Sequence, residues 1–286
     1  MAPEVPPTAP PAGARRLIVN ADDFGRSSSI NQAVLRAHRE GILTSASLMV
    51  NEPACAEAVA MARDNPSLGV GLHLTLLCGR SALPAQSIPG LLNGSGQFVD
   101  DPVQAGMRYF FQPALRRQLR EEIHEQFKRF HQTGLPLDHL NGHLHLHLHP
   151  TVFGILMEDA EELGIRHMRL TRDPYWLDAR LMAGRRLYRS VHAAIYCLLS
   201  WKARRPLLRR RIAFSQRVFG LLQNGRVNED YISKLLPALP AGDSELYSHP
   251  SLDEFKHEFE ALISPRVKEQ VKELGIQLIR YRDLQP

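Results

Sequence analysis

Strand-like and helix-like patterns alternate along the first part of the chain. Short runs of β-branched and apolar residues predict strands, and apolar positions spaced three or four residues apart predict helices. In chain order these segments are 16–21 (strand), 28–41 (helix), 45–50 (strand), 53–63 (helix) and 69–76 (strand). Ser28 or Ser29 can cap the first helix, Gly41 can end it, and Pro53 suits the first turn of the second. The chain thus begins as repeated strand and helix units.

The alternation resumes after a long segment rich in proline and glycine, residues 77–101, which predicts a loop of the kind that covers active sites. The further elements that we expect are 113–132 (helix), 138–150 (strand), 151–163 (helix), 165–170 (strand), 244–249 (strand), 252–274 (helix) and 276–281 (strand). Such alternation predicts an α/β fold with a mainly parallel sheet, either closed into a barrel or doubly wound. In both architectures ligands bind at the carboxyl ends of the strands.

The bulk composition is that of a folded globular protein, with 44% apolar and 23% charged residues in a chain of 286. Three scattered cysteines without a paired motif favour a reducing compartment. Residues 1–15 lack both the basic start and the apolar run of a secretory signal, and we interpret them as a disordered tail. No run approaches the ~20 apolar residues of a membrane span. We therefore expect a cytoplasmic protein.

Positive charge is concentrated in one segment, residues 180–226, which holds eleven arginines and Lys202 but no acidic residue. Because the whole chain carries +5, the remainder is net negative. An apolar run from Val191 to Trp201 lies inside this segment, and we interpret about 173–240 as a basic helical insertion. This composition favours a helix that lies on an anionic membrane surface, at its inner face. A solvated excursion that pairs with the acidic remainder fits equally well. Nucleic-acid binding is not supported, because no recognised module accompanies the charge.

Five histidines fall within the segment 138–150, separated mostly by leucines. They are His139, His143, His145, His147 and His149. If this segment stays extended, the odd-numbered imidazoles share one face and the leucines share the other. Neutral imidazole is the commonest protein ligand for divalent ions, so this strand predicts a metal site.

Two earlier motifs can complete such a site. Asp22 and Asp23 follow the first predicted strand, so one acid can face a metal while the other faces substrate or water. Taken alone, the pair fits a turn or a helix N-terminus as well. His73 lies between Leu72 and Leu74 and, taken alone, fits a hydrogen-bonded core histidine better than a ligand.

Together these motifs resemble the YdjC-like carbohydrate deacetylases, and the resemblance spans Arg16 to about Asp283. The matching motifs are Asn20-Ala21-Asp22-Asp23-Phe24-Gly25, Gly71-Leu72-His73-Leu74, the run from His139 to His147, and Ser248-His249-Pro250. The basic insertion and Gly71-Leu72-His73-Leu74-Thr75-Leu76 are most similar to the hopanoid-biosynthesis branch, HpnK.

The resemblance implies a distorted TIM-like (β/α) barrel of about seven strands, as one domain over 16–286. It implies one divalent metal ion held by Asp23, His73 and His143. It further implies that Asp22 is the general base, that His249 is the acid, and that His145 contacts substrate. The reaction would remove the acetyl group from an N-acetylated amino sugar, in the HpnK branch an N-acetylglucosaminyl hopanoid.

Two features complicate this assignment. The family usually has Asp-Ser before the first histidine of the cluster, whereas this chain has Asn141-Gly142. The missing carboxylate is expected to weaken metal binding or retune the histidine. In addition, His145-x-x-x-His149-Pro150 mimics the pattern of polysaccharide deacetylases, although the position of Pro150 and the flanking His139 favour His143 as the ligand.

Several alternatives stay open. Two imidazoles and a carboxylate suit zinc better than magnesium by ligand softness, whereas the resemblance implies magnesium. The enzyme alternatives are a chitooligosaccharide deacetylase and another barrel metallohydrolase such as a phosphoesterase. A non-catalytic protein that binds metal or a membrane surface is the alternative from another class. The oligomeric state, including a homodimer, is also open.

Overall fold

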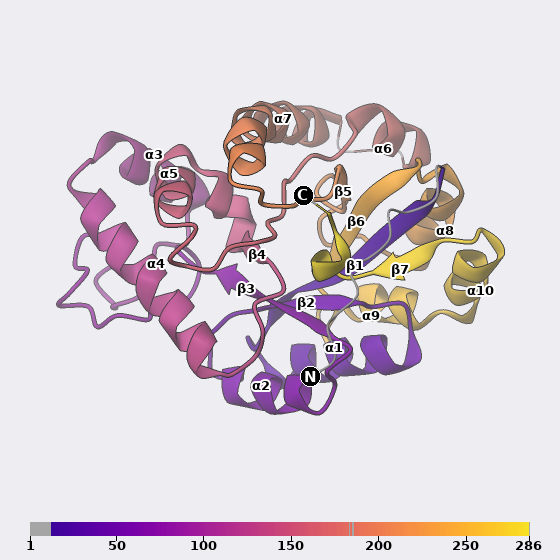
Figure 1. Cartoon of the computed structure of the whole chain (residues 1–286), viewed down its shortest axis with the longest axis horizontal. Helices are drawn as coiled ribbons and strands as arrows, with labels where there is room; N and C mark the ends of the chain where they lie inside the picture. The colour runs from indigo at the N-terminus through magenta and orange to yellow at the C-terminus, as the bar shows by residue number, and fades with distance from the viewer. Residues whose placement is uncertain (1–12, 183, 185, 286) are drawn as a thin grey trace.

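The computed structural model describes residues 13–182, 184 and 186–285. A curled, wholly parallel sheet forms its centre, and helices surround it (Figure 1). The strands are β1 (Arg15–Phe24), β2 (Ser45–Leu48), β3 (Gly69–Leu74), β4 (Leu140–Gly142), β5 (Arg217–Phe219), β6 (Gly242–Ser248) and β7 (Gln277–Ile279). They follow the order β4-β3-β2-β1-β6-β5, and β7 pairs with β1. This is the predicted α/β fold, a distorted TIM-like barrel.

The segment 165–172 lies between the two outer strands of this order and curls the sheet toward closure. Leu140 forms a parallel bridge with Met168, and His167 forms one with Ala213. The backbone N–H of Val218 in β5 donates to the carbonyl of Arg172 at 3.0 Å. The strand that we expect at 165–170 is therefore reduced to isolated bridges, although it occupies the place in the barrel that a strand would take.

Helices cover the outside of the sheet, and their apolar faces pack on strands whose residues are almost all buried. They are α1 (Ser28–Glu40), α2 (Cys55–Arg63), α3 (Pro102–Phe111), α4 (Leu115–Gln132), α5 (Pro150–Glu158), α6 (Tyr175–Leu181), α7 (Arg186–Arg209), α8 (Glu229–Ala238), α9 (Lys256–Ile263) and α10 (Pro265–Glu273). Two short 3-10 helices are η1 (His143–Leu148) and η2 (Tyr281–Asp283).

Several predicted boundaries are corrected by the structure. Ser27, rather than Ser28 or Ser29, caps α1, because its side chain accepts a hydrogen bond from the Ile30 N–H at 3.3 Å. The expected helix over 252–274 is divided into α9 and α10 at Ser264 and Pro265, and the expected last strand ends at Ile279. Strand β1 starts at Arg15, inside the expected tail, and residues 1–12 of that prediction lie outside the described residues.

The segment about 173–240 contains the helices α6, α7 and α8, as expected for a helical insertion. It also contains β5, which pairs in parallel with β6 and so belongs to the central sheet. Across the described residues, none of the helices is both long enough and apolar enough to span a bilayer.

Candidate metal centre and active site

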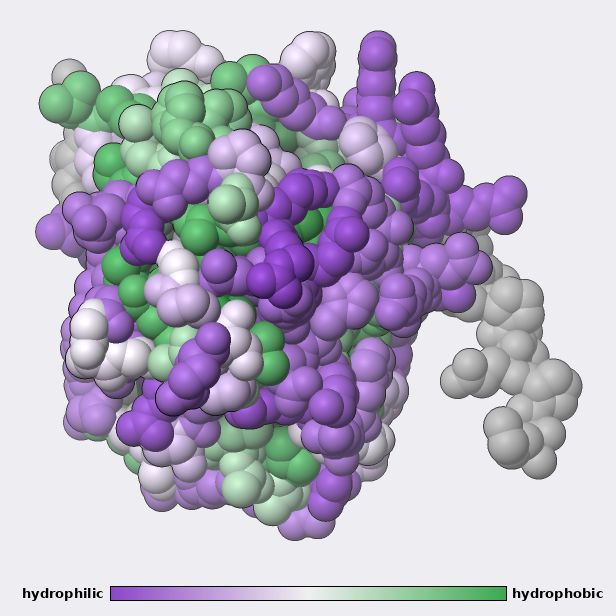
Figure 2. All heavy atoms as spheres, turned by 90° about the vertical axis from the view of Figure 1, so that its left-hand side faces the viewer, coloured by the Kyte–Doolittle hydropathy of each residue, from purple (hydrophilic) through white to green (hydrophobic). Residues whose placement is uncertain are grey.

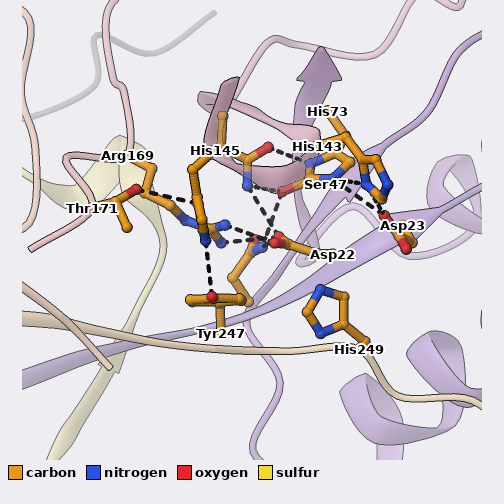
Figure 3. Close-up of polar contacts among 12 residues, drawn as sticks. Asp22, Asp23, Ser47, His73, His143, His145, Arg169, Thr171, Tyr247 and His249 are labelled. Atoms are coloured by element: carbon orange, nitrogen blue, oxygen red, sulfur yellow. Dashed lines mark hydrogen bonds and ion pairs between the residues drawn. The ribbon is translucent and has the colours of Figure 1, made fainter. Parts of the chain in front are cut away.

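The adjacent acids Asp22 and Asp23 lie at the carboxyl end of β1, where the strand is irregular. Its pairing with β2 shifts register between Ala21 and Phe24, and Asp23 has a left-handed φ of 64°. Neighbouring residues of a regular strand point to opposite faces of the sheet. The irregularity allows both carboxylates to reach one cluster of polar side chains, as Figure 3 shows.

Asp23, His73 and His143 form a buried group whose donor atoms lie within 4.8 Å of one another. The Asp23 Oδ1 atom is 3.2 Å from His73 Nε2 and 3.0 Å from His143 Nδ1. His73 is the penultimate residue of β3, and His143 directly follows β4, so neighbouring parallel strands bring both rings to the same edge. One carboxylate and two imidazoles are a donor set that suits one divalent ion. The three residues expected to ligate a metal are thus brought together.

Asn141 orients His73 toward this group. Its Oδ1 atom lies 2.7 Å from His73 Nδ1 and accepts the ring proton, which leaves Nε2 directed at Asp23. Its Nδ2 group donates to Asp22 at 3.0 Å and to Ser47 at 2.8 Å. The family usually has an aspartate at this position. The amide of Asn141 orients the histidine as that carboxylate would, and in addition it donates to Asp22.

The histidine-rich segment does not stay extended, which corrects the expectation that its five imidazoles share one face. Strand β4 ends at Gly142, and the chain then turns into η1, with Leu144 and His145 at positive φ of 48° and 58°. His143 consequently faces Asp23, whereas His147 Nε2 donates to the carbonyl of Arg169. His149 Nε2 donates to the carbonyl of Gly106 at 3.1 Å. The alternative assignment would require His145 and His149 as metal ligands. In the described structure, the convergent group contains neither of them.

Asp22 belongs to a fully buried ion network. The guanidinium of Arg169 donates to its two carboxylate oxygens at 2.7 and 2.9 Å. The same guanidinium donates to Glu245 at 2.6 and 2.8 Å and lies 4.4 Å from the centre of the Tyr247 ring. One arginine thus holds a carboxylate from β1 and another from β6.

Charge in this network controls the ionisation of the site. Burial would raise the pKa of Asp22, but the positive charge of Arg169, helped by His73, outweighs it and holds the pKa far below its ordinary value. For Asp23, burial is likewise outweighed by His143 and His73, and its pKa is also lowered. Both carboxylates are therefore ionised at neutral pH.

A cavity of about 140 Å³ opens beside the network. Asp22, His73 and His145 line it, as does His249, which follows β6. In Figure 3 the His249 ring points toward the two aspartates. Helix α7 contributes Tyr188, His192 and Tyr196 to the lining. The candidate base, the candidate acid and the candidate substrate contact thus share one cavity.

His145 is fixed by polar neighbours from two other parts of the barrel. Its Nε2 atom is 2.9 Å from the Tyr247 hydroxyl, and its Nδ1 atom is 3.3 Å from Thr171 Oγ1. Burial, together with the charge of Arg169, lowers the pKa of His145 well below its ordinary value. The ring is therefore neutral at pH 7 and is held in place at the cavity wall by both of its nitrogens.

Arg169, Glu245 and Tyr247 are site residues that the sequence did not predict. The available signal was a charged residue inside a buried apolar strand segment, as in Met168-Arg169-Leu170 and Glu245-Leu246. A fully buried charge requires a partner. Nothing in the sequence, however, identifies which buried acid pairs with which buried base.

Comparison with known proteins places the chain in a family. Residues 16–273 match the model of the YdjC-like protein family, and the chain belongs to that family. A carbohydrate deacetylase of Brevibacillus brevis is 42% identical over 51% of this chain and 56% of its own length. A carbohydrate deacetylase of Geobacillus stearothermophilus is 40% identical over 55% of this chain and 62% of its own length. The match thus spans little more than half of these relatives.

A solved structure supports the fold over nearly the whole chain. It is that of a candidate cellobiose-phosphate cleavage protein from Enterococcus faecalis, with a TM-score of 0.69 and 23% identity. The alignment covers 94% of this chain and 98% of that one. This similarity shows the fold alone.

Proposed function

We propose that this protein is a metal-dependent hydrolase that removes the acetyl group from an N-acetylated amino sugar. The observation that carries the proposal is the ionised Asp22 carboxylate, which lines one cavity with His73 of the convergent metal-binding group and with His249. Two relatives named carbohydrate deacetylase support the same reaction. A protein that only stores or senses a metal needs the ligands but not a second carboxylate beside them.

Asp23, His73 and His143 would hold the ion. When bound, the ion supplies Lewis acidity, which polarises the acetamide oxygen and acidifies the attacking water so that a weak base suffices. Asp22 takes the proton from that water, and Arg169 keeps the carboxylate ionised and fixed for this role. His249 donates a proton to the leaving nitrogen. By ligand softness zinc fits the donor set better than magnesium. The family resemblance implies magnesium, so both ions are candidates.

The decisive variant is Asp22→Asn. It keeps the size of the side chain but removes its basicity, so acetate release should fall at least about 100-fold while the protein still binds the ion. The matched control is Asp230→Asn, which alters an exposed carboxylate that pairs with Lys234 on α8. Retained turnover in Asp22→Asn would remove Asp22 from its role, and loss of ion binding in that variant would make it a ligand instead.

We further propose that the acetylated sugar is carried by a lipid, as N-acetylglucosaminyl hopanoid would be. This rests on the resemblance to the HpnK branch and on α7, which lines the cavity and bears exposed apolar side chains. Leu187, Val191, Ile195, Leu198 and Trp201 are each at least 45% exposed. A chitooligosaccharide is the alternative substrate. Metal-stripped protein resupplied with zinc, magnesium or manganese should release acetate from the lipid and not from chitobiose, whereas the reverse would keep the chemistry and reject the lipid.

The proposed partner for the outer face of α7 is an anionic membrane surface. Its apolar residues are followed by the exposed cations Lys202, Arg205 and Arg209. Helix α3, whose Pro102 lines the same cavity, adds Val103, Met107, Phe110 and Phe111, each more than half exposed. In Figure 2 hydrophobic residues gather in the upper left of the face shown, and hydrophilic residues project at the upper right. Apolar residues beside basic ones are what an interfacial helix requires.

Co-sedimentation with phosphatidylglycerol vesicles tests this partner. The change of Arg209, Arg210 and Arg211 to Gln should abolish binding at low salt, because each cation near the surface contributes about 1 kcal/mol. Lys256, Lys268 and Lys272, changed to Gln on α9 and α10, form the matched control. No sedimentation of the unaltered protein, or equal loss in the control, would reject the membrane.

A further inference from the structure

A second cavity lies on the other flank of α7. Its volume is about 530 Å³, and it is bounded by α6, by the start of β5 and by Ala193, Cys197 and Arg204 of α7. The candidate active-site cavity uses Tyr188, His192 and Tyr196 of the same helix. Positions 193, 197 and 204 are centred about 120° around the helix from positions 188, 192 and 196. One helix therefore separates two cavities, and Figure 1 shows it running beside α6 at the top of the view.

Three arginines line this second cavity, which we call the arginine cavity. They are Arg172, Arg204 and Arg217, from three separate parts of the chain. Among the described residues, the side chains of Arg172 and Arg204 have no hydrogen bond or ion pair. Within the described part of the chain, the Arg217 side chain makes two hydrogen bonds, both at 3.5 Å, to Gln216 Oε1 and to the carbonyl of Ala241. Three arginines thus line one space, and in the described structure none of their guanidinium groups pairs with an acid.

Asp173 is the one acid among the described residues that line the arginine cavity. Its Oδ2 atom accepts a hydrogen bond from the Leu222 N–H at 3.1 Å, and its Oδ1 atom is buried without a partner. Burial, reinforced by the neighbouring charge of Asp178, raises the pKa of Asp173 well above its ordinary value. A protonated Asp173 does not neutralise the arginines and can itself donate a hydrogen bond.

The remaining lining is apolar and aromatic. Tyr175, Trp176, Phe214 and Leu170 contribute to it, and Trp176 is 78% exposed. Arginine presents several donors in a planar fork that matches tetrahedral oxyanions, and it stacks on aromatic rings. A ligand with a multiply charged oxyanion and an apolar or planar portion would satisfy both parts of the lining. A monovalent carboxylate would leave most of the positive charge unpaired.

We propose that the arginine cavity is a binding site for a phosphate-bearing ligand, separate from the cavity where deacetylation is proposed. Phosphate oxygens would accept from Arg172, Arg204 and Arg217, and the rest of the ligand would lie against Trp176. The phosphate can belong to a small soluble molecule or to a lipid headgroup. The assignment does not depend on the deacetylase reaction, because none of these residues belongs to the metal group or to the Asp22 network.

Tryptophan fluorescence gives a direct test. The chain has two tryptophans, so Trp201→Phe leaves Trp176 as the reporter at the cavity. Titration with inorganic pyrophosphate at constant ionic strength should change the Trp176 signal saturably. Arg172→Gln and Arg217→Gln, each in this background, should weaken binding about tenfold or more, because each removes a charge-assisted hydrogen bond. Arg266→Gln, which changes a 65% exposed arginine on α10, should leave binding unchanged.

The source of the phosphate is distinguished by a second titration, with vesicles of phosphatidylglycerol and of phosphatidylcholine. Saturation by pyrophosphate at micromolar concentration assigns a soluble ligand. A response to phosphatidylglycerol vesicles alone, lost in Arg172→Gln, assigns a lipid headgroup. No response to either probe, or equal weakening by Arg266→Gln, would overturn the proposal. Circular dichroism of each variant confirms folding, which is expected because Arg172 is exposed.

Discussion

Arg169 and Arg172 lie three residues apart, yet they use the same charge in opposite ways. Arg169 is fully buried and donates to Asp22 and Glu245. Arg172 is exposed, lines the arginine cavity and pairs with no acid among the described residues. The buried charge is satisfied inside the protein and so fixes the positions of its partners, whereas the exposed one is available to a ligand. The same contrast separates the two cavities on either flank of α7.

The largest difference is expected when each of these two arginines is replaced in turn. Arg169→Gln leaves two buried carboxylates without their cation, so the free energy of unfolding should fall by about 3–5 kcal/mol. Arg172→Gln removes an unpaired surface charge and should change the free energy of unfolding by no more than about 0.5 kcal/mol. Urea denaturation of both variants measures the difference. Similar losses in the two would show that the exposed arginine is also structural.

Ligand-induced stabilisation should show that the two cavities bind different ligands. Zinc at 100 times its dissociation constant should stabilise the unaltered protein by about 2.7 kcal/mol, and His143→Ala should lose this gain because a ligand is missing. Pyrophosphate should raise the Tm of both proteins equally, since the arginine cavity does not contain His143. Thermal unfolding with each additive is the measurement. A pyrophosphate effect that disappears with His143→Ala would place both ligands at one site.

Acid should lower the free energy of unfolding through the buried His147. Burial lowers the pKa of His147 to about 3, whereas the unfolded chain has the ordinary value of 6.5. The unfolded state therefore binds more protons between these values, and stability falls as pH decreases. This histidine should account for a loss of about 1 kcal/mol between pH 7.5 and pH 5.5. His147→Gln should flatten that part of the stability curve in urea titrations; an unchanged slope would show that another group controls it.

The smallest expected effect comes from Asn141→Asp. The amide now donates to Asp22 at 3.0 Å, and a carboxylate there would instead place a second negative charge beside it. Like charges raise a carboxyl pKa, so the acid limb of kcat/KM should move upward by about one pH unit. Asn228→Asp, at the cap of α8, is the control. An unmoved acid limb would mean that the ionisation of Asp22 does not control the rate.

Much of the site was predictable because it depends on where strands end. Asp22, Asp23 and His73 lie within two residues of the carboxyl ends of their strands, and His249 directly follows its strand; the carboxyl ends of parallel strands meet at one edge. Local patterns therefore sufficed to predict a parallel α/β fold with these residues at one edge, whereas the family resemblance was needed to choose the barrel over a doubly wound sheet. The alternation rule failed for the histidine-rich segment, because positive φ at Leu144 and His145 turns the chain after three residues of strand.

What the sequence by itself determined was the order of the elements, the metal-binding residue types and the charge of the segment that contains α7. Only the tertiary structure decided that Arg169 pairs with Asp22 and Glu245, 147 and 76 residues away in the chain. It also decided that Arg172 and Arg204 face one cavity. The physical reason is that a charge pattern is local, whereas the partner of a charge depends on which distant strands and helices pack beside it.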